Sequence, residues 1–301
     1  MRIILLGTAA GGGFPQWNCW CPTCRAAREE PHRALPRTQS SAAVSADGER
    51  WFLLNASPDV RQQLSCVPGP LRTDVRHVPI EGVALTDAEL DHTLGILLLR
   101  EARSLQLYAT NPVRAILEQD SRILPVTRAF ANTSVTPLPV GDQVQLCYRD
   151  GSPSGLFLES FLVPAGPPRF ASGAEPGHTT GFLIRDATDG SCAFVPGCGE
   201  LTASLLEYLN TVDVLLFDGT FWRDEELIDL GISNRTARAM DHLPVSGAHG
   251  SLMQLAELTV PHKVYTHINN TNPMLLEDSS ERAAVEQAGV TVGSDGMSFL
   301  V

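Results

Sequence analysis

Short runs of apolar residues alternate along this chain with stretches in which apolar residues recur every three or four positions. The first pattern is typical of buried β-strands and the second of amphipathic α-helices. In the first half this pattern predicts strands at 1–7, 41–45, 51–54 and 82–85, and helices at 58–64 and 92–103. In the second half it predicts strands at 180–185, 192–195, 212–217 and 263–266, and helices at 201–209, 224–230 and 280–288. Asp47-Gly48 and Asp189-Gly190 lie between neighbouring strands and are typical hairpin turns.

The order of these elements indicates the fold class. Strands and helices are mixed in both halves of the chain, which predicts a layered α/β sandwich. No internal repeat, low-complexity tract or long linker divides residues 1–301, so we expect a single domain. No apolar run approaches the roughly 18 residues of a membrane helix, and residues 1–7 look like a strand rather than a signal peptide. We therefore expect a soluble, cytoplasmic protein with no membrane partner.

The charge of the chain limits its partners. The formal net charge is −12, which would repel a polyanion at long range and argues against nucleic acid as a substrate. A small anionic ligand is compatible with this charge, because a local cluster of arginines can override the global sign. The seven cysteines are an odd number in a chain without a secretion signal, which favours thiols or metal ligands over a disulfide scaffold.

Three of these cysteines are crowded into one segment. Cys19, Cys21 and Cys24 lie within six residues, and three thiolates at this spacing can close around one tetrahedral Zn²⁺. The alternative is three unliganded thiols in a loop. A closed zinc site needs a fourth ligand, and the sequence does not choose among the candidates, which are His32, Cys198, His262 and Asn270. Such a site would be structural and would hold the N-terminal loop in place.

A second cluster, at 86–95, reads T-D-A-E-L-D-H-T-L-G. It resembles the T-H-x-H-x-D-H-x-x-G motif that enzymes of the metallo-β-lactamase fold carry at the end of a buried strand. The chain keeps the threonine, the Asp91-His92 pair and the glycine of that motif, but has Asp87 and Glu89 in place of the first two histidines. Taken alone, the segment could equally be an acidic helix start, where carboxylates favour the N-terminal dipole.

Later segments favour the resemblance, which extends over 2–301. Residues 264–270 match the late T-H of the fold at a strand end, 212–218 match the strand that ends in an acidic residue beside the site, and the segment with His242 and His249 resembles the histidine-bearing loop of the ribonuclease Z and phosphodiesterase branch. The glycine-rich opening at 7–15, followed by C-x-C-x-x-C, resembles both the PqqB family and the cyclic-phosphate dihydrolase of phosphonate breakdown. The segments 55–59 and 266–273 resemble the PqqB family specifically. The resemblance implies an α/β fold, the metallo-β-lactamase-like αββα sandwich.

Departures from the motif determine the chemistry that we expect. The histidine pair that binds the first metal is replaced, the bridging aspartate position is Gly197, and His178 is wrongly spaced for the third histidine motif. One metal site is therefore expected, with Asp91, His92 and His267 as its ligands. Two imidazoles and one carboxylate form the facial triad typical of Fe(II) enzymes that activate O₂, although another divalent metal would fit, and His92 alone could be a buried structural histidine.

Three further residues complete the expected site. Asp218 is expected beside the metal, as a fourth contact or as a partner of the ligands. Asp87 and Glu89 are expected to face the cavity without a metal of their own and to position a water or a substrate amine. The catalytic assignments are thus Asp87, Glu89 and Asp218.

The resemblance implies a function in the synthesis of pyrroloquinoline quinone (PQQ). The first hypothesis is an iron-dependent oxygenase, an oxidoreductase that hydroxylates the tyrosine-derived ring of a cross-linked Glu–Tyr precursor. The second is a hydrolase of the phosphodiesterase type, which needs a metal-bound hydroxide, usually between two metals. The third is a non-catalytic carrier that transports PQQ or its precursor. A homodimer is compatible with each of them.

Overall fold

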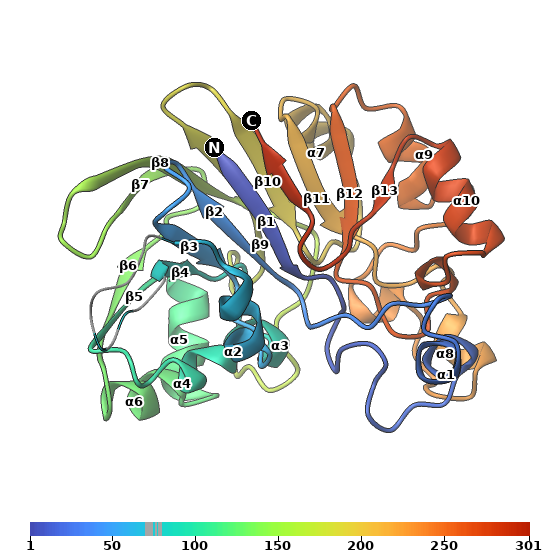
Figure 1. The fold of residues 1–301 in the computed structure, drawn as a ribbon, viewed down its shortest axis with the longest axis horizontal. Helices are drawn as coiled ribbons and strands as arrows, with labels where there is room; N and C mark the ends of the chain where they lie inside the picture. The colour runs from blue at the N-terminus through green and yellow to red at the C-terminus, as the bar shows by residue number, and fades with distance from the viewer. Residues whose placement is uncertain (70–74, 76, 78–79) are drawn as a thin grey trace.

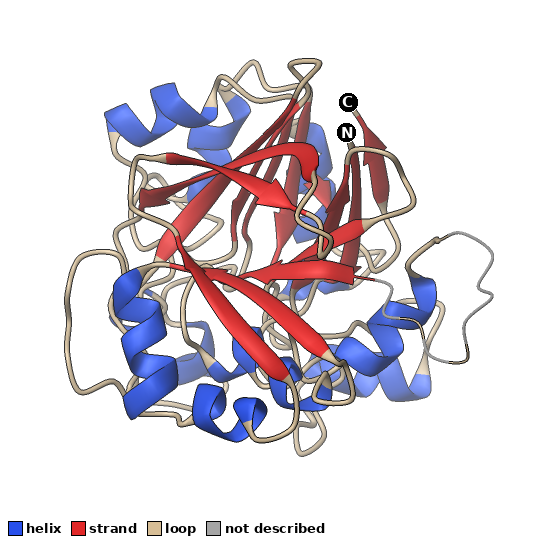
Figure 2. Ribbon diagram, turned by 90° about the vertical axis from the view of Figure 1, so that its left-hand side faces the viewer, coloured by secondary structure: helices blue, strands red, loops and turns tan. Residues whose placement is uncertain are grey.

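Two β-sheets pack face to face and carry helices on their outer faces, so that the layers follow the order αββα (Figures 1 and 2). The structure is a computed structural model that describes residues 1–69, 75, 77 and 80–301. The two chain ends lie side by side at one end of the sandwich (Figure 1), where the backbone amide of Val301 donates to the carbonyl of Met1. The layered sandwich predicted from the sequence is confirmed.

The first sheet has the strand order β14-β1-β2-β3-β4-β5-β6. Its strands are β1 (Arg2–Gly7), β2 (Ser41–Ser45), β3 (Trp51–Leu54), β4 (Ile80–Ala84), β5 (Ser104–Ala109), β6 (Asn132–Pro137) and β14 (Ser298–Leu300). The pairs from β14 to β3 are antiparallel, and those from β3 to β6 are parallel.

The second sheet has the order β13-β12-β11-β10-β9-β8-β7. Its strands are β7 (Gln143–Cys147), β8 (Pro153–Leu162), β9 (Thr180–Asp186), β10 (Ser191–Val195), β11 (Val214–Asp218), β12 (His262–Thr266) and β13 (Thr291–Val292). Strands β10 to β13 are mutually parallel, so their carboxyl ends meet at one edge of the sheet.

The helices form two groups, one on each outer face (Figure 1). Those against the first sheet are α2 (Val60–Gln63), α3 (Leu90–Thr93), α4 (Gly95–Leu98), α5 (Asn111–Gln119) and α6 (Ile123–Arg128). The others are α1 (Pro22–Glu29), α7 (Ala203–Leu209), α8 (Glu226–Asp229), α9 (Ser251–Ala256) and α10 (Ser280–Gln287). Short 3₁₀ turns lie at Leu64–Cys66, Arg238–Met240 and Pro273–Leu275. None of the helices in the described part of the chain has the length and apolarity needed to cross a bilayer.

Side-chain alternation along the strands creates three apolar layers. In β1, Ile3 and Leu5 point between the sheets, where they pack with residues of both. Ile4 and Leu6 point the other way, into the layer between the first sheet and its helices. A strand buried on both faces reads as a continuous apolar run rather than an alternating one, which is why the pattern at 1–7 predicts a strand without showing alternation.

Most predicted elements agree with the structure. Strands β2 and β3 pair antiparallel as the predicted hairpin, and Asp189 takes a positive φ of 69° in the second predicted turn. One prediction was wrong: 92–103 is not one helix, because the helix is broken at Leu94 into α3 and α4. Gly95 lies against backbone there, since an added Cβ would be 2.3 Å from the carbonyl oxygen of Ser57. This close approach places the start of α4 directly against the loop after β3.

Candidate metal centre

A cavity of about 510 Å³ opens where the carboxyl ends of several strands meet. Strand β11 ends in Asp218, β12 is followed directly by His267, and β4 is followed after two residues by Asp87. All three strands have parallel neighbours, so their ends collect side chains from distant parts of the sequence. Ligand sites commonly form at this edge of α/β sheets.

Asp91, His92 and His267 converge on the floor of this cavity. Their ligand atoms all lie within 4.8 Å of one another, with Asp91 Oδ2 3.2 Å from His267 Nε2 and 3.8 Å from His92 Nε2. Neighbouring ligands of a metal that lies about 2.1 Å from each are roughly 3–3.6 Å apart. The structure therefore brings together the three predicted ligands at a spacing that one divalent ion can bridge, and their assignment as ligands stays a prediction.

His92 is oriented by Asp87. Its Nδ1 lies 2.8 Å from both carboxylate oxygens, which also accept from the Thr86 hydroxyl and the Glu89 backbone amide. This leaves Nε2 as the free nitrogen, and Nε2 is buried with no hydrogen-bond partner among the described residues. A buried, unpaired imidazole nitrogen is costly unless something binds it, and a metal is bound by histidines held in this way.

The electrostatics of the site also favour a cation. Burial alone would lower the pKa of His92, but the charges of Asp87 and Asp91 raise it to about 9. Burial alone would raise the pKa of Asp91, but His92 and His267 hold it well below its usual range. The carboxylates thus stabilise positive charge at this point, and a divalent cation would satisfy them in the same way as a protonated imidazole.

His267 is held by Thr220 and Asp218. The Thr220 Oγ1 lies 2.8 Å from His267 Nδ1 and 2.5 Å from Asp218 Oδ1, so it accepts from the ring N–H and donates to the carboxylate. His267 itself has a positive φ of 53°, a conformation that costs free energy in a non-glycine residue and often occurs at functional sites. Thr220 therefore points His267 Nε2 at Asp91.

His242 is the residue that the sequence analysis left without a role. Its Nδ1 lies 2.7 Å from Asp218 Oδ2, and its ring stacks on that of His267 with 5.4 Å between centroids. Burial alone would lower the pKa of His242, but Asp218 raises it. Burial alone would raise the pKa of Asp218, but His242 and His267 lower it. The resemblance of this loop to the histidine-bearing loop of the phosphodiesterase branch was the signal that could have assigned it, whereas His249 in the same segment is exposed.

Asp87 and Glu89 have different surroundings although both line the cavity. Asp87 is buried and its carboxylate is fully occupied by His92, Thr86 and a backbone amide, so it acts on the site through His92. Glu89 is exposed at the mouth, where partial burial, together with the charges of Asp87 and Asp91, raises its pKa to about 7. Glu89 is thus the carboxyl group that can exchange a proton near neutral pH.

The loss of the first metal site stays a prediction, and the structure shows where the residues concerned lie. Gly197 lines the cavity and offers no side-chain ligand. The ring of His178 lies near the carbonyl oxygens of Ala165 and Glu175 and is outside the metal-binding groups found among the described residues. A second group of possible ligands, Asp218, His242 and His267, shares His267 with the first, but Asp218 is already occupied by His242, Thr220 and the backbone amide of Cys198.

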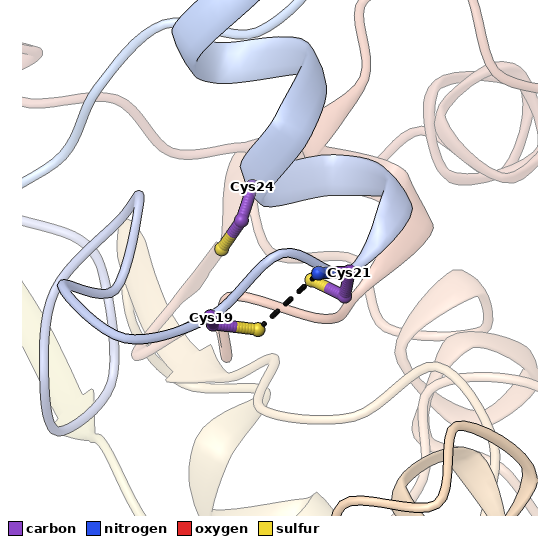
Figure 3. A group of neighbouring side chains, drawn as sticks. All are labelled: Cys19, Cys21 and Cys24. Carbon is purple, nitrogen blue, oxygen red and sulfur yellow. Dashed lines mark hydrogen bonds between the residues drawn. The ribbon is translucent and has the colours of Figure 1, made fainter.

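The three clustered cysteines do not line this cavity. They lie at the start of α1 and in the loop before it (Figure 3). Their sulfur atoms all lie within 4.8 Å of one another. A hydrogen bond from the Cys24 thiol lowers the pKa of Cys21 to about 5, against the effect of burial. The same hydrogen bond raises the pKa of Cys24. A thiolate is the form that binds metal, so the spacing of the three sulfur atoms and the ionisation of Cys21 fit a zinc ion.

Asn270 is the candidate fourth ligand that the structure places at these thiols. Its Nδ2 lies 3.3 Å from Cys24 Sγ and 3.7 Å from Cys21 Sγ, and an amide group can turn to present its oxygen instead. Within the described ranges, no His, Asp, Glu or fourth Cys joins the three thiols, so His32, Cys198 and His262 do not reach them. Asn270 follows His267 by three residues, which connects the thiol cluster to the metal-ligand loop.

Replacing Cys21 by serine should remove one equivalent of zinc per chain. A hydroxyl is a poor zinc ligand, and two thiols with an amide do not close a tetrahedral site. The N-terminal loop should then be cut faster in limited proteolysis, because the Cys-cluster contacts to Asn270 are lost. Metal analysis of the purified protein measures the change, with the exposed Cys66→Ser variant as a control. An unchanged zinc content in Cys21→Ser would exclude a zinc site here.

Comparison with known proteins defines the class. The family model described as a β-lactamase superfamily domain matches residues 50–268. The chain is 45% identical over 306 residues to coenzyme PQQ synthesis protein B of Methylobacterium nodulans, which covers 99% of both chains. It is 43% identical over 309 residues to the same protein of Gluconobacter oxydans, covering 99% of this chain and 97% of that one.

Comparison with solved structures supports the same family. The Zn²⁺-bound PqqB from Methylobacterium extorquens superposes with a TM-score of 0.89 at 39% identity, covering 100% of both chains. A diphosphatase of the PhnP family superposes with a TM-score of 0.68 at 19% identity, over 100% of this chain and 97% of that one, and shares the fold alone. The architecture is therefore that of the metallo-β-lactamase fold. Within it, the chain belongs to the coenzyme PQQ synthesis protein B (PqqB) family, which confirms the resemblance seen in the sequence.

Proposed function

We propose that this chain acts in PQQ biosynthesis as an iron-dependent oxygenase that hydroxylates the tyrosine-derived ring of a cross-linked Glu–Tyr precursor. Its relatives are named coenzyme PQQ synthesis protein B, which supports the pathway. The observation that carries the chemistry is the convergence of Asp91, His92 and His267 on one point of the cavity. Two imidazoles and one carboxylate with open positions form the ligand set of non-haem Fe(II) oxygenases.

The ligand set determines which reactions the site suits. When bound, Fe(II) would supply the activation of O₂ that ring hydroxylation requires. One oxygen atom enters a C–H bond as C–OH, and the other leaves as water with two electrons and two protons from a reductant. A metal hydrolase of this fold instead uses two metals, and Asp87 and Gly197 stand where two of its ligands would be. The relative crystallised with Zn²⁺ supports a divalent metal, with iron as our specific proposal.

Residues of the chain itself would move protons in the cavity and hold the ligand imidazoles in position. His242 has its Nδ1 held by Asp218, so its Nε2 is the nitrogen that can exchange a proton with a molecule in the cavity. Glu89, with its pKa raised to about 7, is suited to the same task at the mouth. Asp87 and Thr220 keep the two ligand imidazoles in place, which preserves the geometry between turnovers.

Incubation with the precursor tests this function. Protein purified without oxygen and loaded with Fe(II) should convert the cross-linked diamino acid, with O₂ and ascorbate, to a product that is heavier by one oxygen atom, as measured by mass spectrometry. The expected metal content is one zinc and one iron per chain. The same protein loaded with Zn²⁺ alone should be inactive, because zinc has no redox chemistry. Fully iron-loaded protein that gives no such product would contradict the proposal, and PQQ binding without turnover would indicate a carrier.

We also expect no turnover of RNA, cyclic nucleotides or β-lactams. The acidic net charge disfavours polyanions, and the first metal site lacks its histidine pair. Hydrolysis assays with these substrates, at protein concentrations that give full ring hydroxylation, measure whether any turnover occurs. Hydrolysis at ordinary enzymatic rates that disappears in a His92→Ala variant would instead assign the site to a hydrolase.

A further inference from the structure

Two arginines line the same cavity as the candidate metal ligands, and neither forms an ion pair with a described residue. Arg169 comes from the loop between β8 and β9, and Arg235 from the loop after α8. In the described part of the chain, neither has a carboxylate within salt-bridge distance, and the guanidinium of Arg235 donates to the carbonyl of Ala239 only. Both side chains therefore keep donors available to a molecule in the cavity.

This lack of partners contrasts with the rest of the molecule. The chain carries 34 acidic and 22 basic residues, so carboxylates are abundant. Among the described residues, seven other arginines have a carboxylate within salt-bridge distance: Arg33, Arg50, Arg100, Arg128, Arg149, Arg223 and Arg282. The cavity itself holds four carboxylates, of which Asp87 and Asp91 are occupied by the ligand histidines. The arginines of the cavity are thus separated from its acids rather than neutralised by them.

The cavity also offers apolar surface near the arginines. Phe170 is part exposed and follows Arg169 directly, while Phe221 is buried with its ring 5.9 Å from that of His242. Met240 lines the same cavity. An aromatic body can pack on these side chains, and carboxylates at its rim can pair with planar guanidinium groups, which match carboxylates in shape.

We infer that Arg169 and Arg235 recognise carboxylates of an aromatic, multiply carboxylated ligand and hold its ring over Asp91, His92 and His267. This inference rests on the proposed function for the orientation of the ring, but the recognition itself is a matter of binding. The arginines also explain how a chain of net charge −12 admits an anionic ligand, because they supply a local positive potential at the entrance.

Calorimetric titration of the zinc-loaded protein with PQQ, a planar quinone with three carboxylates, tests the inference without any oxidation step. Arg169→Gln and Arg235→Gln should each weaken PQQ binding by about 10-fold or more, while metal content and melting temperature stay unchanged. The trimethyl ester of PQQ, which lacks the negative charges, should bind the wild type and both variants equally weakly. Inorganic phosphate at millimolar concentration should not displace PQQ, because phosphate can pair with a guanidinium group but cannot pack on the apolar side chains of the cavity.

Arg238→Gln is the matched control, since Arg238 lies three residues from Arg235 and is exposed but does not line the cavity. PQQ affinity unchanged in both cavity variants, an equal loss in Arg238→Gln, or no PQQ binding by the wild type would each overturn the inference. Arginine-dependent PQQ binding without ring hydroxylation would remove the oxygenase proposal and leave this inference standing. Ring hydroxylation with an unaltered KM in the cavity variants would overturn this inference and leave the oxygenase proposal standing.

Discussion

Replacing His92 by alanine should remove the active-site metal and reduce oxygen-dependent activity to background, while the zinc at the three cysteines stays bound. The imidazole Nε2 is buried and unpaired among the described residues, and Asp87 fixes its direction through Nδ1. Without this ring, Asp91 and His267 are two ligands, too few to hold Fe(II) in competition with water. His267→Ala should have the same result, because His267 is the other imidazole of the group.

Metal analysis and the mass-spectrometric assay on the same preparations measure both losses. His249→Ala is the control, since His249 is exposed in the same half of the chain as His267 and belongs to no candidate metal group. A His92→Ala protein that still supports PQQ synthesis in cells would remove the case for catalysis and leave a carrier. One that keeps its iron but loses activity would show that His92 acts on the substrate instead.

The strands of the sandwich were predictable where both faces are buried. Strand β11, for example, is buried at every position, and its sequence is a single apolar run that ends in an acid. The segment 104–162 gave no prediction, although it contributes β5 to β8. Strand β6 and strand β7 are edge strands with mixed polar faces, so their sequences carry little pattern. Strand β8 does alternate in burial, and that alternation was the signal available for it.

The site was predictable only as far as residue type and position along the chain allow. Asp91, His92 and His267 could be named because the segments 86–95 and 264–270 resemble motifs of the metallo-β-lactamase fold. The partners could not be named, because pairing depends on how β11 and β12 lie against the loop that carries His242. Asp87 illustrates the limit: the sequence places it in the cavity, but only the fold shows that its carboxylate holds His92.

Asp218 holds His242 directly and His267 through Thr220. Asp218→Asn should therefore lower both stability and activity. The carboxylate is fully buried and accepts four hydrogen bonds: from the backbone amides of Cys198 and Thr220, the Thr220 hydroxyl, and His242 Nδ1. An asparagine of the same shape has one oxygen and one NH₂ group, so in either orientation its NH₂ faces a backbone amide, of Thr220 or of Cys198, that can only donate. We expect a loss of about 3 kcal/mol in the free energy of unfolding.

The loss of activity should exceed what reduced stability explains. Without the negative charge, His242 loses the partner that raises its pKa and fixes Nε2 towards the cavity, and Thr220 holds His267 less firmly. We expect kcat to fall about 100-fold or more at a temperature where the variant is fully folded, with a smaller change in KM. Thermal melting, metal analysis and steady-state rates of ring hydroxylation on the same samples separate the two effects.

Asp213→Asn provides the matched control for this variant. Asp213 precedes the same strand and accepts from the backbone amide and hydroxyl of Ser191, but it lies outside the cavity. Its replacement should lower the melting temperature without altering kcat, because it disturbs β11 at the end remote from the ligands. If Asp218→Asn and Asp213→Asn lowered kcat equally, Asp218 would be a structural residue of β11 with no part in positioning His242 and His267. If Asp218→Asn alone lost turnover while keeping its metal, the Asp218–His242 pair would be required for the reaction itself.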